Sequence, residues 1–240
     1  QFVDSSDRQA VTDLIKMNGL VDVVIPRGGA GLIQAVVQNA TVPVIETGIG
    51  VCHTYVDAGA DYDMARAIAI NAKVQRPAVC NAMETLLVHE DAAAEFLPQM
   101  LTEYFAAGVT IIGCGKTQAF DKRIQAATEA DWATEYGDLR LSVKIVSGLE
   151  EALAHIAKYG TKHSECIVTS DYNHARTFQQ RVDAAAVYVN ASTRFTDGFE
   201  FGFGAEIGIS TQKLHARGPM ALPELTSSKY LISGDGQIRG

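Results

Sequence analysis

The order of strand-like and helix-like segments along the chain constrains its fold more than any other feature. Short runs rich in β-branched residues, such as VDVVI at 21–25 and LSVKIV at 141–146, alternate with longer segments that carry apolar residues at helical spacing. Strands that are separated by helices in this way usually pair in parallel, and the helices pack on the faces of the sheet. The sequence therefore predicts an α/β fold with helices on both faces of a parallel sheet.

The predicted elements cover most of the 240 residues. We expect strands at 21–25, 42–45, 84–89, 108–113, 141–146, 166–169, 185–190 and 230–236. We expect helices at 7–18, from the glycine cluster to about residue 39, and at 61–76, 91–107, 148–158, 171–181 and 222–229. The Gly-, Ser- and Thr-rich stretch 191–220 is expected as a long loop, and a loop of that length usually carries function.

Charge and cysteine content exclude several classes of protein. The chain has 28 acidic and 20 basic residues, and a net charge of −8 disfavours binding to nucleic acid. No apolar run approaches the ~18 residues that a membrane span needs, and the first residues lack the features of a signal peptide. The four cysteines form no CxxC pair and the histidines are scattered, so we expect free thiols, a cytoplasmic location and no metal site.

A glycine-rich turn joins the strand predicted at 21–25 to the helix that follows. Gly28, Gly29 and Gly31 stand where backbone N–H groups and a helix dipole favour an anion. The turn does not match the GxGxxG pattern of dinucleotide-binding loops. It is equally consistent with a phosphate-binding turn and with a tight connection between two elements.

Cys80 lies at the break between a predicted helix and a predicted strand, in the segment QRPAVCNAMETLLVH. Pro77 ends the helix, so Cys80 is expected on irregular backbone, where a thiol is available for chemistry. We expect nearby donors or Arg76 to lower its pKa, because the thiolate is the nucleophile. The alternative is a small buried side chain, which is the interpretation we favour for Cys166 and, less firmly, for Cys52 and Cys114.

Two further groups follow the ends of predicted strands. Glu46 comes directly after the strand at 42–45, where a carboxylate could face a cleft or cap a turn. Asn190, Ser192, Thr193 and Arg194 follow the strand at 185–190. Arg194 could clamp a carboxylate or phosphate with help from the hydroxyls, or the segment could be a solvated loop.

Five segments in order resemble the gamma-glutamyl phosphate reductase family (glutamate-5-semialdehyde dehydrogenase) of the aldehyde dehydrogenase superfamily. They are VDVVIPRGGAGLI, VPVIETGIGVCHTYVD, QRPAVCNAMETLLVH, VYVNASTRFTDG and STQKLHARGPM. The resemblance implies NADPH-dependent reduction of L-glutamyl 5-phosphate to L-glutamate 5-semialdehyde and phosphate, a step of proline biosynthesis. It implies an aldehyde-dehydrogenase-like fold, a homo-oligomer, and L-glutamyl 5-phosphate as the small-molecule partner, with channelling from glutamate 5-kinase.

The resemblance also implies roles for individual residues. Cys80 matches the family's nucleophile, and Glu46 precedes it by 34 residues, as a glutamate does in aldehyde dehydrogenases. Binding of NADP(H) is expected at Gly28, Gly29, Gly31 and Glu135, of which Glu135 would contact the nicotinamide ribose. The glutamyl pocket is expected to contain Asn190, Ser192, Thr193 and Arg194.

The resemblance implies three parts: the end of a Rossmann-type cofactor domain at 1–46, a catalytic domain at 47–215, and a C-terminal helix and oligomerisation strand at 216–240. Members of the family carry a large N-terminal segment that the chain lacks, including most of the cofactor domain. One alternative is therefore a truncated half that folds without being active. A second alternative is a cysteine hydrolase that uses Cys80 with a histidine, although no histidine has motif support. The preference for NADP over NAD is also open.

Overall fold

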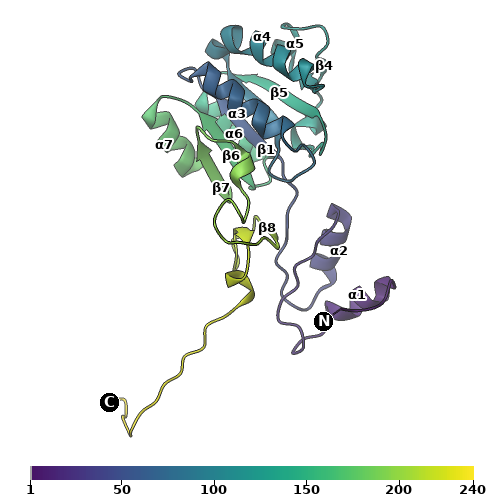
Figure 1. Ribbon diagram of the computed structural model, residues 1–240, viewed down its shortest axis with the longest axis vertical. Helices are drawn as coiled ribbons and strands as arrows, with labels where there is room; N and C mark the ends of the chain where they lie inside the picture. The colour runs from purple at the N-terminus through teal and green to yellow at the C-terminus, as the bar shows by residue number, and fades with distance from the viewer. Residues whose placement is uncertain (1) are drawn as a thin grey trace.

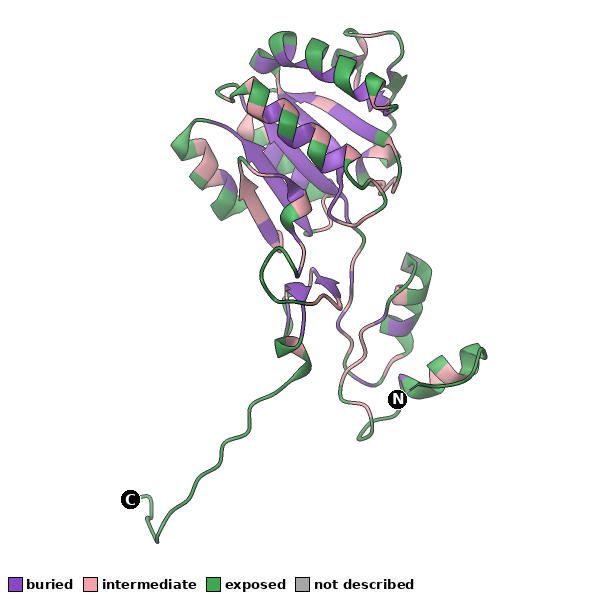
Figure 2. Cartoon of the chain, in the orientation of Figure 1, coloured by how far each residue is buried: buried purple, intermediate pink, exposed green. Residues whose placement is uncertain are grey.

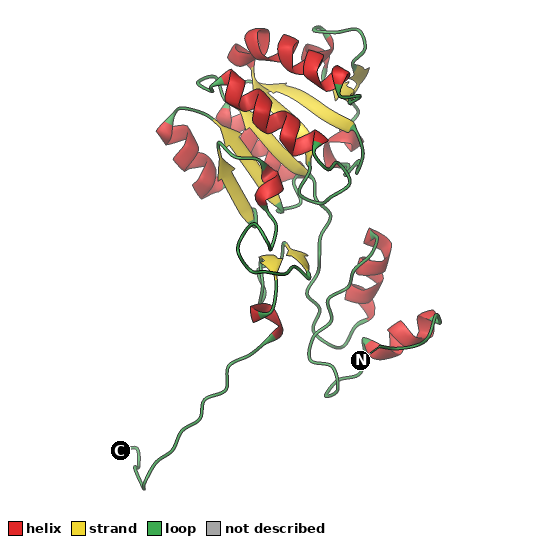
Figure 3. Ribbon diagram, in the orientation of Figure 1, coloured by secondary structure: helices red, strands yellow, loops and turns green. Residues whose placement is uncertain are grey.

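The computed structural model describes residues 2–240, and a seven-stranded parallel sheet forms its centre. In space the strands follow the order β4-β3-β5-β2-β1-β6-β7. Their bounds are β1 Cys52–Val56, β2 Met83–His89, β3 Thr110–Gly113, β4 Gln125–Ala126, β5 Arg140–Val146, β6 Ser164–Val168 and β7 Ala186–Val189. Figure 1 and Figure 3 show this sheet in the upper part of the molecule, between layers of helices. The predicted α/β class is confirmed.

Four long helices cover the two faces of the sheet. They are α3 Tyr62–Val74 and α4 Glu90–Ala106 on one face, and α6 Leu149–Tyr159 and α7 Tyr172–Arg181 on the other. Alternate residues of β2 point to opposite faces, because a strand has a period of two. Leu86 and Val88 thus join the core beneath α3 and α4, whereas Leu87 joins the core beneath α6 and α7. Both faces are buried, as Figure 2 shows.

The inner strand β1, which lies between β2 and β6, is not predicted from the sequence. Its residues Cys52–Val56 are all buried, although His53 and Thr54 interrupt the apolar pattern. His53 is accommodated because Nδ1 lies 2.9 Å from Oε2 of Glu165, its register partner on β6. The same carboxylate oxygen accepts the His53 backbone N–H at 2.8 Å. A polar residue can therefore occupy the middle of this sheet when its neighbour supplies the hydrogen-bond partner.

Residues 2–49 lie beside the sheet rather than within it (Figure 1). They contain α1 Arg8–Leu14 and α2 Ala30–Asn39. The strands predicted at 21–25 and 42–45 are reduced to isolated parallel bridges, between Val24 and Val44 and between Asn18 and Val21. Pro26 and Pro43 remove backbone donors at these positions, and two short strands without further neighbours are marginal.

The C-terminal part differs from the prediction, with more regular structure at 191–220 and less after residue 221. The predicted loop at 191–220 contains η2 Thr193–Phe195 and a two-stranded antiparallel sheet of β8 Gly208–Ser210 and β9 Gly218–Met220. The helix expected at 222–229 is only the 3-10 turn η3 Pro223–Leu225, and the strand expected at 230–236 is absent. A strand needs a hydrogen-bonding partner, and the tail extends away from the rest of the chain (Figure 1). The division into domains at 46 and 215 stays a prediction.

The remaining short elements are α5 Gly115–Gln118, beside β3 and β4, and the 3-10 helix η1 Glu129–Ala133, whose Glu129 accepts hydrogen bonds from Lys158 and Tyr159 at the end of α6. Among residues 2–240, no helix combines the length and apolar composition that a bilayer crossing requires.

Candidate active site

Cys80 lies in a tight turn at the entrance to β2. The helix α3 ends at Val74, and the backbone N–H of Ala82 then closes a turn by donating to the carbonyl oxygen of Val79 at 2.9 Å. The thiol is therefore on irregular backbone, as the sequence predicts from Pro77, and it is partly rather than fully buried. The turn lies at the amino-terminal edge of the sheet, because β2 begins three residues later at Met83.

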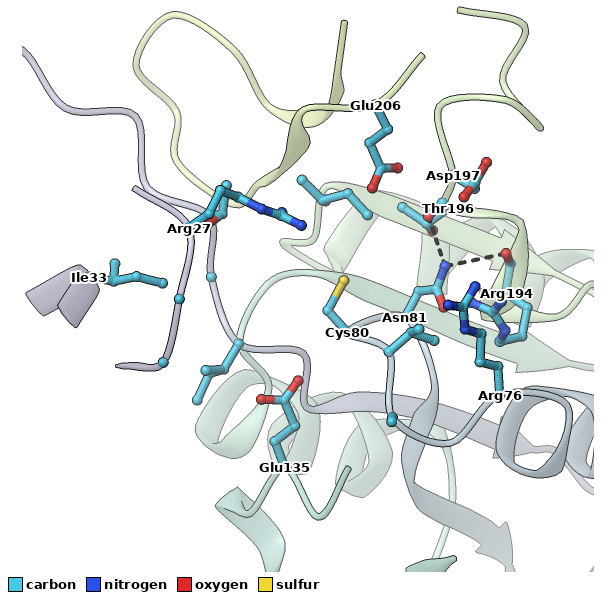
Figure 4. A pocket seen from close by; sticks show the side chains of 18 residues that line it. Arg27, Ile33, Arg76, Cys80, Asn81, Glu135, Arg194, Thr196, Asp197 and Glu206 are labelled. Atoms are coloured by element: carbon cyan, nitrogen blue, oxygen red, sulfur yellow. Dashed lines mark hydrogen bonds between the residues drawn. The ribbon is translucent and has the colours of Figure 1, made fainter. Parts of the chain in front are cut away.

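A pocket of about 580 Å³ surrounds Cys80. It lies between the segment around α2, the Cys80 turn, and η2 with the loops that follow η1 and η2 (Figure 4). Its charged lining residues are Arg27, Arg76, Glu135, Arg194, Asp197 and Glu206. Figure 4 shows Sγ of Cys80 near the centre, with Glu206 and Glu135 on opposite sides of it and Arg27 reaching toward it. The pocket thus presents three cationic and three anionic side chains around one thiol.

The backbone of Cys80 is held in place from beneath. The Sγ of Cys52 donates to the carbonyl oxygen of Cys80 at 3.2 Å. A β-carbon added at Gly50 would lie 1.5 Å from that same oxygen, so only glycine fits there. The backbone N–H of Gly50 also donates to Oε1 of Glu135 at 2.8 Å. Gly50 therefore connects the Cys80 turn to the Glu135 carboxylate.

The η2 segment packs against the other side of the turn through Asn81. The Nδ2 of Asn81 donates to the carbonyl oxygens of Thr196 at 2.8 Å and Arg194 at 3.3 Å. In return, Nη1 of Arg194 donates to Oδ1 of Asn81, and its Nε donates to Gln75 at 2.7 Å. The hydroxyl of Thr193 donates to the carbonyl oxygen of Asn81 at 2.7 Å. These bonds fix the Arg194 guanidinium at the wall of the pocket.

The electrostatic surroundings of Cys80 differ from the prediction. Burial raises the pKa of the thiol to about 11, and the negative charges of Glu206 and Glu135 add to this effect. Arg27, rather than Arg76, is the cation that acts in the lowering direction. The expected lowered pKa is therefore wrong for the pocket as it stands. A buried thiol that faces two carboxylates keeps its proton. It needs a base to become a thiolate, and the two carboxylates are candidates for that base.

The predicted residues that share the pocket with Cys80 are Gly28, Gly29, Glu135 and Arg194. Gly31 lines a different cavity, of about 740 Å³, between α1 and α2. Glu46 lines an adjoining cavity of about 480 Å³, where its Oε1 accepts a hydrogen bond from Nε2 of Gln212 at 3.0 Å. Thr47, Gly48 and Ile49 line both this cavity and the pocket of Cys80, so the two spaces are neighbours.

The other three predicted substrate residues support the loop from behind. Asn190 clamps Thr169, since its Oδ1 accepts the Thr169 N–H and its Nδ2 donates to the Thr169 carbonyl, both at 2.9 Å. The Ser192 hydroxyl caps η2 by accepting the backbone N–H of Arg194 at 3.3 Å. Thr193 is fully buried against Asn81. None of these three lines the pocket.

Several pocket residues were not predicted from the sequence. Arg27 directly precedes the predicted glycine turn, so its place in the chain was a usable signal. Glu206 had no such signal, because only the fold brings it over Cys80. None of the described residues that line the pocket is a histidine. In the described chain, no three His, Cys, Asp or Glu side chains gather in a way that could hold a metal ion.

The N-terminus of α2 has the character of an anion site. Gly29 is the N-cap residue and offers no side-chain cap, and no atom lies within 4 Å of a β-carbon added there. Gly28 and Gly29 also line the pocket of Cys80. A helix N-terminus that is open in this way favours a phosphate group. The residues present thus fit a phosphate-bearing cofactor on this side of the pocket.

No protein-family model matches the chain. A curated relative from Moorella thermoacetica, named gamma-glutamyl phosphate reductase, is 65% identical over 239 residues, which are 100% of this chain and 57% of the relative. The crystal structure of gamma-glutamyl phosphate reductase from Thermotoga maritima is 53% identical with a TM-score of 0.97, and the match covers 100% of this chain and 58% of that one.

A more distant solved structure defines the wider fold. An acetylating aldehyde dehydrogenase from Geobacillus thermoglucosidasius matches 79% of this chain and 50% of its own, with a TM-score of 0.61 and 19% identity. The predicted aldehyde-dehydrogenase-like fold is confirmed. Over its whole length the chain is thus similar to proteins named gamma-glutamyl phosphate reductase, and it spans about 57% of the length of the curated relative.

Proposed function

We propose that Cys80 is the nucleophile in the NADPH-dependent reduction of L-glutamyl 5-phosphate to L-glutamate 5-semialdehyde and phosphate. The observation that carries this proposal is the pocket itself. One partly exposed thiol lies among three arginines and three carboxylates, and an uncapped helix N-terminus lines the same pocket. That chemistry suits an anionic acyl donor, in a chain that is 65% identical to a relative named for this reaction.

The proposed reaction runs in two halves through Cys80. The thiolate attacks the acyl carbon, the C–O bond to phosphate breaks, and a thioester forms as phosphate leaves. NADPH, when bound, would supply the hydride that reduces the thioester carbonyl. The C–S bond then breaks, which releases the aldehyde and regenerates the Cys80 thiolate. In sum, the acyl phosphate, NADPH and one proton become the aldehyde, phosphate and NADP⁺.

The side chains of the pocket divide this work by charge. Arg76 and Arg194 line the wall beside Asn81 and could pair with the phosphate or α-carboxylate of the substrate. Glu206 and Glu135 are the pocket carboxylates whose charges act most strongly on the thiol, so either could accept its proton. Gly28 and Gly29 at the start of α2 would hold a cofactor phosphate. Asn190, Ser192 and Thr193 would position the loop of Arg194.

Glu46 and Gly31 have a more distant part in this proposal. Both residues lie in spaces that adjoin the α2 segment, and Glu46 is paired with Gln212. We propose that a thiol-activating role of Glu46 would require this amide pair to open. The division at residues 46 and 215, a homo-oligomer joined through residues 230–236, and channelling from glutamate 5-kinase belong to the same proposal.

The alternative is a folded but incomplete half of the enzyme. It is favoured by one fact, namely that the chain spans only a little over half of its relative. The two candidates differ in one measurement, which is the reverse reaction with glutamate 5-semialdehyde, NADP⁺ and phosphate. Production of NADPH that needs both phosphate and Cys80 supports the reductase, and NADPH production by Cys80→Ala contradicts it.

A matched control keeps this experiment specific. Cys114→Ser changes the other partly exposed thiol, which lies at the start of α5 outside the pocket, and should leave the rate unchanged. If the parent chain is inactive but becomes active when the remaining part of the relative is added, the alternative is correct. If the chain stays inactive in both cases, the proposed function fails.

A further inference from the structure

A buried ion pair lies beside the pocket but does not line it. Lys73 on α3 and Glu84 on β2 are 0% and 1% exposed, and Nζ of Lys73 lies 2.6 Å from Oε2 of Glu84. Burial raises the pKa of Glu84 and lowers that of Lys73, while each charge favours the ionised form of the other. A buried pair of this kind offsets the cost of desolvation only when further hydrogen bonds satisfy it. The second oxygen of Glu84, Oε1, makes such a hydrogen bond.

Oε1 of Glu84 accepts the backbone N–H of Gly137 at 3.2 Å. Gly137 has a φ of +65°, a conformation that favours glycine, and it lies in the loop between η1 and β5. Two residues earlier in this loop, Glu135 enters the pocket of Cys80. Glu84 therefore holds the loop that carries a pocket carboxylate, through a hydrogen bond to an ionised acceptor.

A series of contacts connects the ion pair to the backbone of Cys80. From Gly137 the loop leads back to Glu135, whose Oε1 accepts the Gly50 N–H at 2.8 Å. Gly50 in turn packs against the carbonyl oxygen of Cys80. Tyr136 gives the loop a second anchor, since its hydroxyl lies 2.8 Å from that of Ser142.

Without Glu84 the loop would keep the contact between Tyr136 and Ser142 but lose the hydrogen bond from Gly137 to β2. Lys73 is needed as well, because a buried carboxylate without a cation takes up a proton. A protonated Glu84 would accept the Gly137 bond more weakly.

We propose that Glu84, paired with Lys73, is a positioning residue that sets the Glu135 carboxylate beside Cys80. The inference deepens the proposed function, because it treats Cys80 as the reacting thiol. It assigns a role to two charged residues that touch neither substrate nor thiol. It also explains why an ion pair is retained in a part of the core where apolar side chains would pack.

The test measures the thiol directly and needs neither substrate nor cofactor. The rate of alkylation of Cys80 by iodoacetamide is followed against pH in the Cys114→Ser background, where Cys80 is the one partly exposed thiol of the described chain. Glu135→Gln removes a charge that raises the pKa of Cys80, so this pKa should fall. Glu84→Asp keeps the charge near Lys73 but shortens the reach to Gly137, and should lower the same pKa.

The expected effect is about a twofold to threefold faster alkylation at pH 8 for each variant, as for a pKa lowered by roughly half a unit. In the Glu135→Gln background, Glu84→Asp should add nothing, because the carboxylate that it positions is gone. Glu165→Gln is the matched control. It breaks another buried pair, with His53 at 2.9 Å on β6, and should leave the pKa of Cys80 unchanged.

Three results would overturn the inference. In the first, Glu84→Asp lowers the pKa of Cys80 equally with and without the Glu135 carboxylate. In the second, Glu135→Gln lowers this pKa but Glu84→Asp does not. In the third, Glu135→Gln leaves this pKa unchanged. If Glu84→Asp does not fold, hydrogen exchange of the parent chain decides, since a Gly137 amide that exchanges as fast as an open loop contradicts the bond. Because no turnover is involved, failure here is separate from failure of the reductase assay.

Discussion

The α-carbon of Gly50 faces the carbonyl oxygen of Cys80 so closely that a β-carbon added there would lie 1.5 Å from that oxygen. Real β-carbons do not approach backbone oxygen at that distance, so one of the two segments would have to move. Gly50 precedes β1 and Cys80 precedes β2, and these strands are neighbours in the sheet. The position of the thiol is therefore set by the backbone of the adjacent strand.

Gly50→Ala should displace the Cys80 turn. We expect a loss of unfolding free energy of about 1–3 kcal/mol from overpacking, and a fall of about 100-fold in Cys80-dependent turnover, as for a displacement near 1 Å. Gly59→Ala is the matched control, because no atom lies within 4 Å of a β-carbon there. Chemical denaturation and the reductase assay measure the two effects, and a Gly50→Ala variant with normal stability and turnover would contradict the contact.

The reactivity of Cys80 should rise steeply at alkaline pH. Its pKa of about 11 means that roughly one thiol in ten thousand is ionised at pH 7. In the Cys114→Ser background, the alkylation rate should increase about tenfold per pH unit from 7 to 10 without a plateau. A plateau below pH 9 would show that the pKa of Cys80 lies well below about 11.

Glu206→Gln should make the free thiol more reactive. The Glu206 carboxylate is the strongest of the charges that raise the pKa of Cys80, so its removal should lower that pKa. We expect alkylation at pH 8 to be at least about twofold faster. Glu200→Gln, on an exposed carboxylate outside the pocket, should change nothing. Equal rates for Glu206→Gln and the parent chain would mean that the carboxylate does not act on the thiol.

Arg194→Lys should weaken binding of the anionic substrate more than it affects stability. A lysine cannot make the fork of bonds to Asn81 and Gln75 while presenting charge to the pocket. We expect KM for the acyl phosphate to rise about tenfold to a hundredfold, as for loss of one charged hydrogen bond of 1.5–3 kcal/mol. Arg181→Lys is the control, since Arg181 on α7 forms an exposed pair with Glu150 on α6. An unchanged KM would remove Arg194 from the substrate site.

The pair of His174 and Asp57 should stabilise the fold only over a limited pH range. Burial alone would raise the pKa of Asp57, but hydrogen bonds, first from His174, lower it overall. The bond to Asp57 in turn raises the pKa of His174. Stability from Asp57 is present above its unfolded pKa near 3.9 and is lost as pH falls. Stability from His174 is present below its unfolded pKa near 6.5 and is lost as pH rises through the folded value.

The matching variant is His174→Gln. Its deficit in unfolding free energy relative to the parent should be largest at about pH 5–6 and should shrink above pH 7 and below pH 4. Urea denaturation across pH 3–9 gives this difference directly. A deficit that is independent of pH would show that the imidazole contributes only packing.

The sequence predicts some inner strands of this sheet and misses another. The β5 strand is predicted at 141–146 and found at Arg140–Val146, because an apolar, β-branched run signals it. The β1 strand lacks that signal, since His53 depends on Glu165, which lies 112 positions away. The strand expected at 230–236 fails for the opposite reason, because its pattern is correct but the chain offers it no partner.

The candidate site is predicted in part for similar reasons. Cys80 could be found because Pro77 ends the helix just before it, which is a local effect. The raised pKa of Cys80 could not be found, since it depends on Glu206 from another loop. Likewise, Asn190 looks like a ligand in the sequence, but its amide is used to clamp Thr169.

The wide spacing of Arg27, Cys80, Glu135 and Glu206 along the chain also sets when the pocket can exist. At a translation rate of about 5–20 residues per second, roughly 6–25 s separate the synthesis of residue 80 from that of residue 206. Throughout this interval the nascent Cys80 lacks the carboxylate and much of the burial that later suppress its ionisation. The thiol is thus most exposed to oxidants and electrophiles while the protein is being made, and completion of the chain is what protects it.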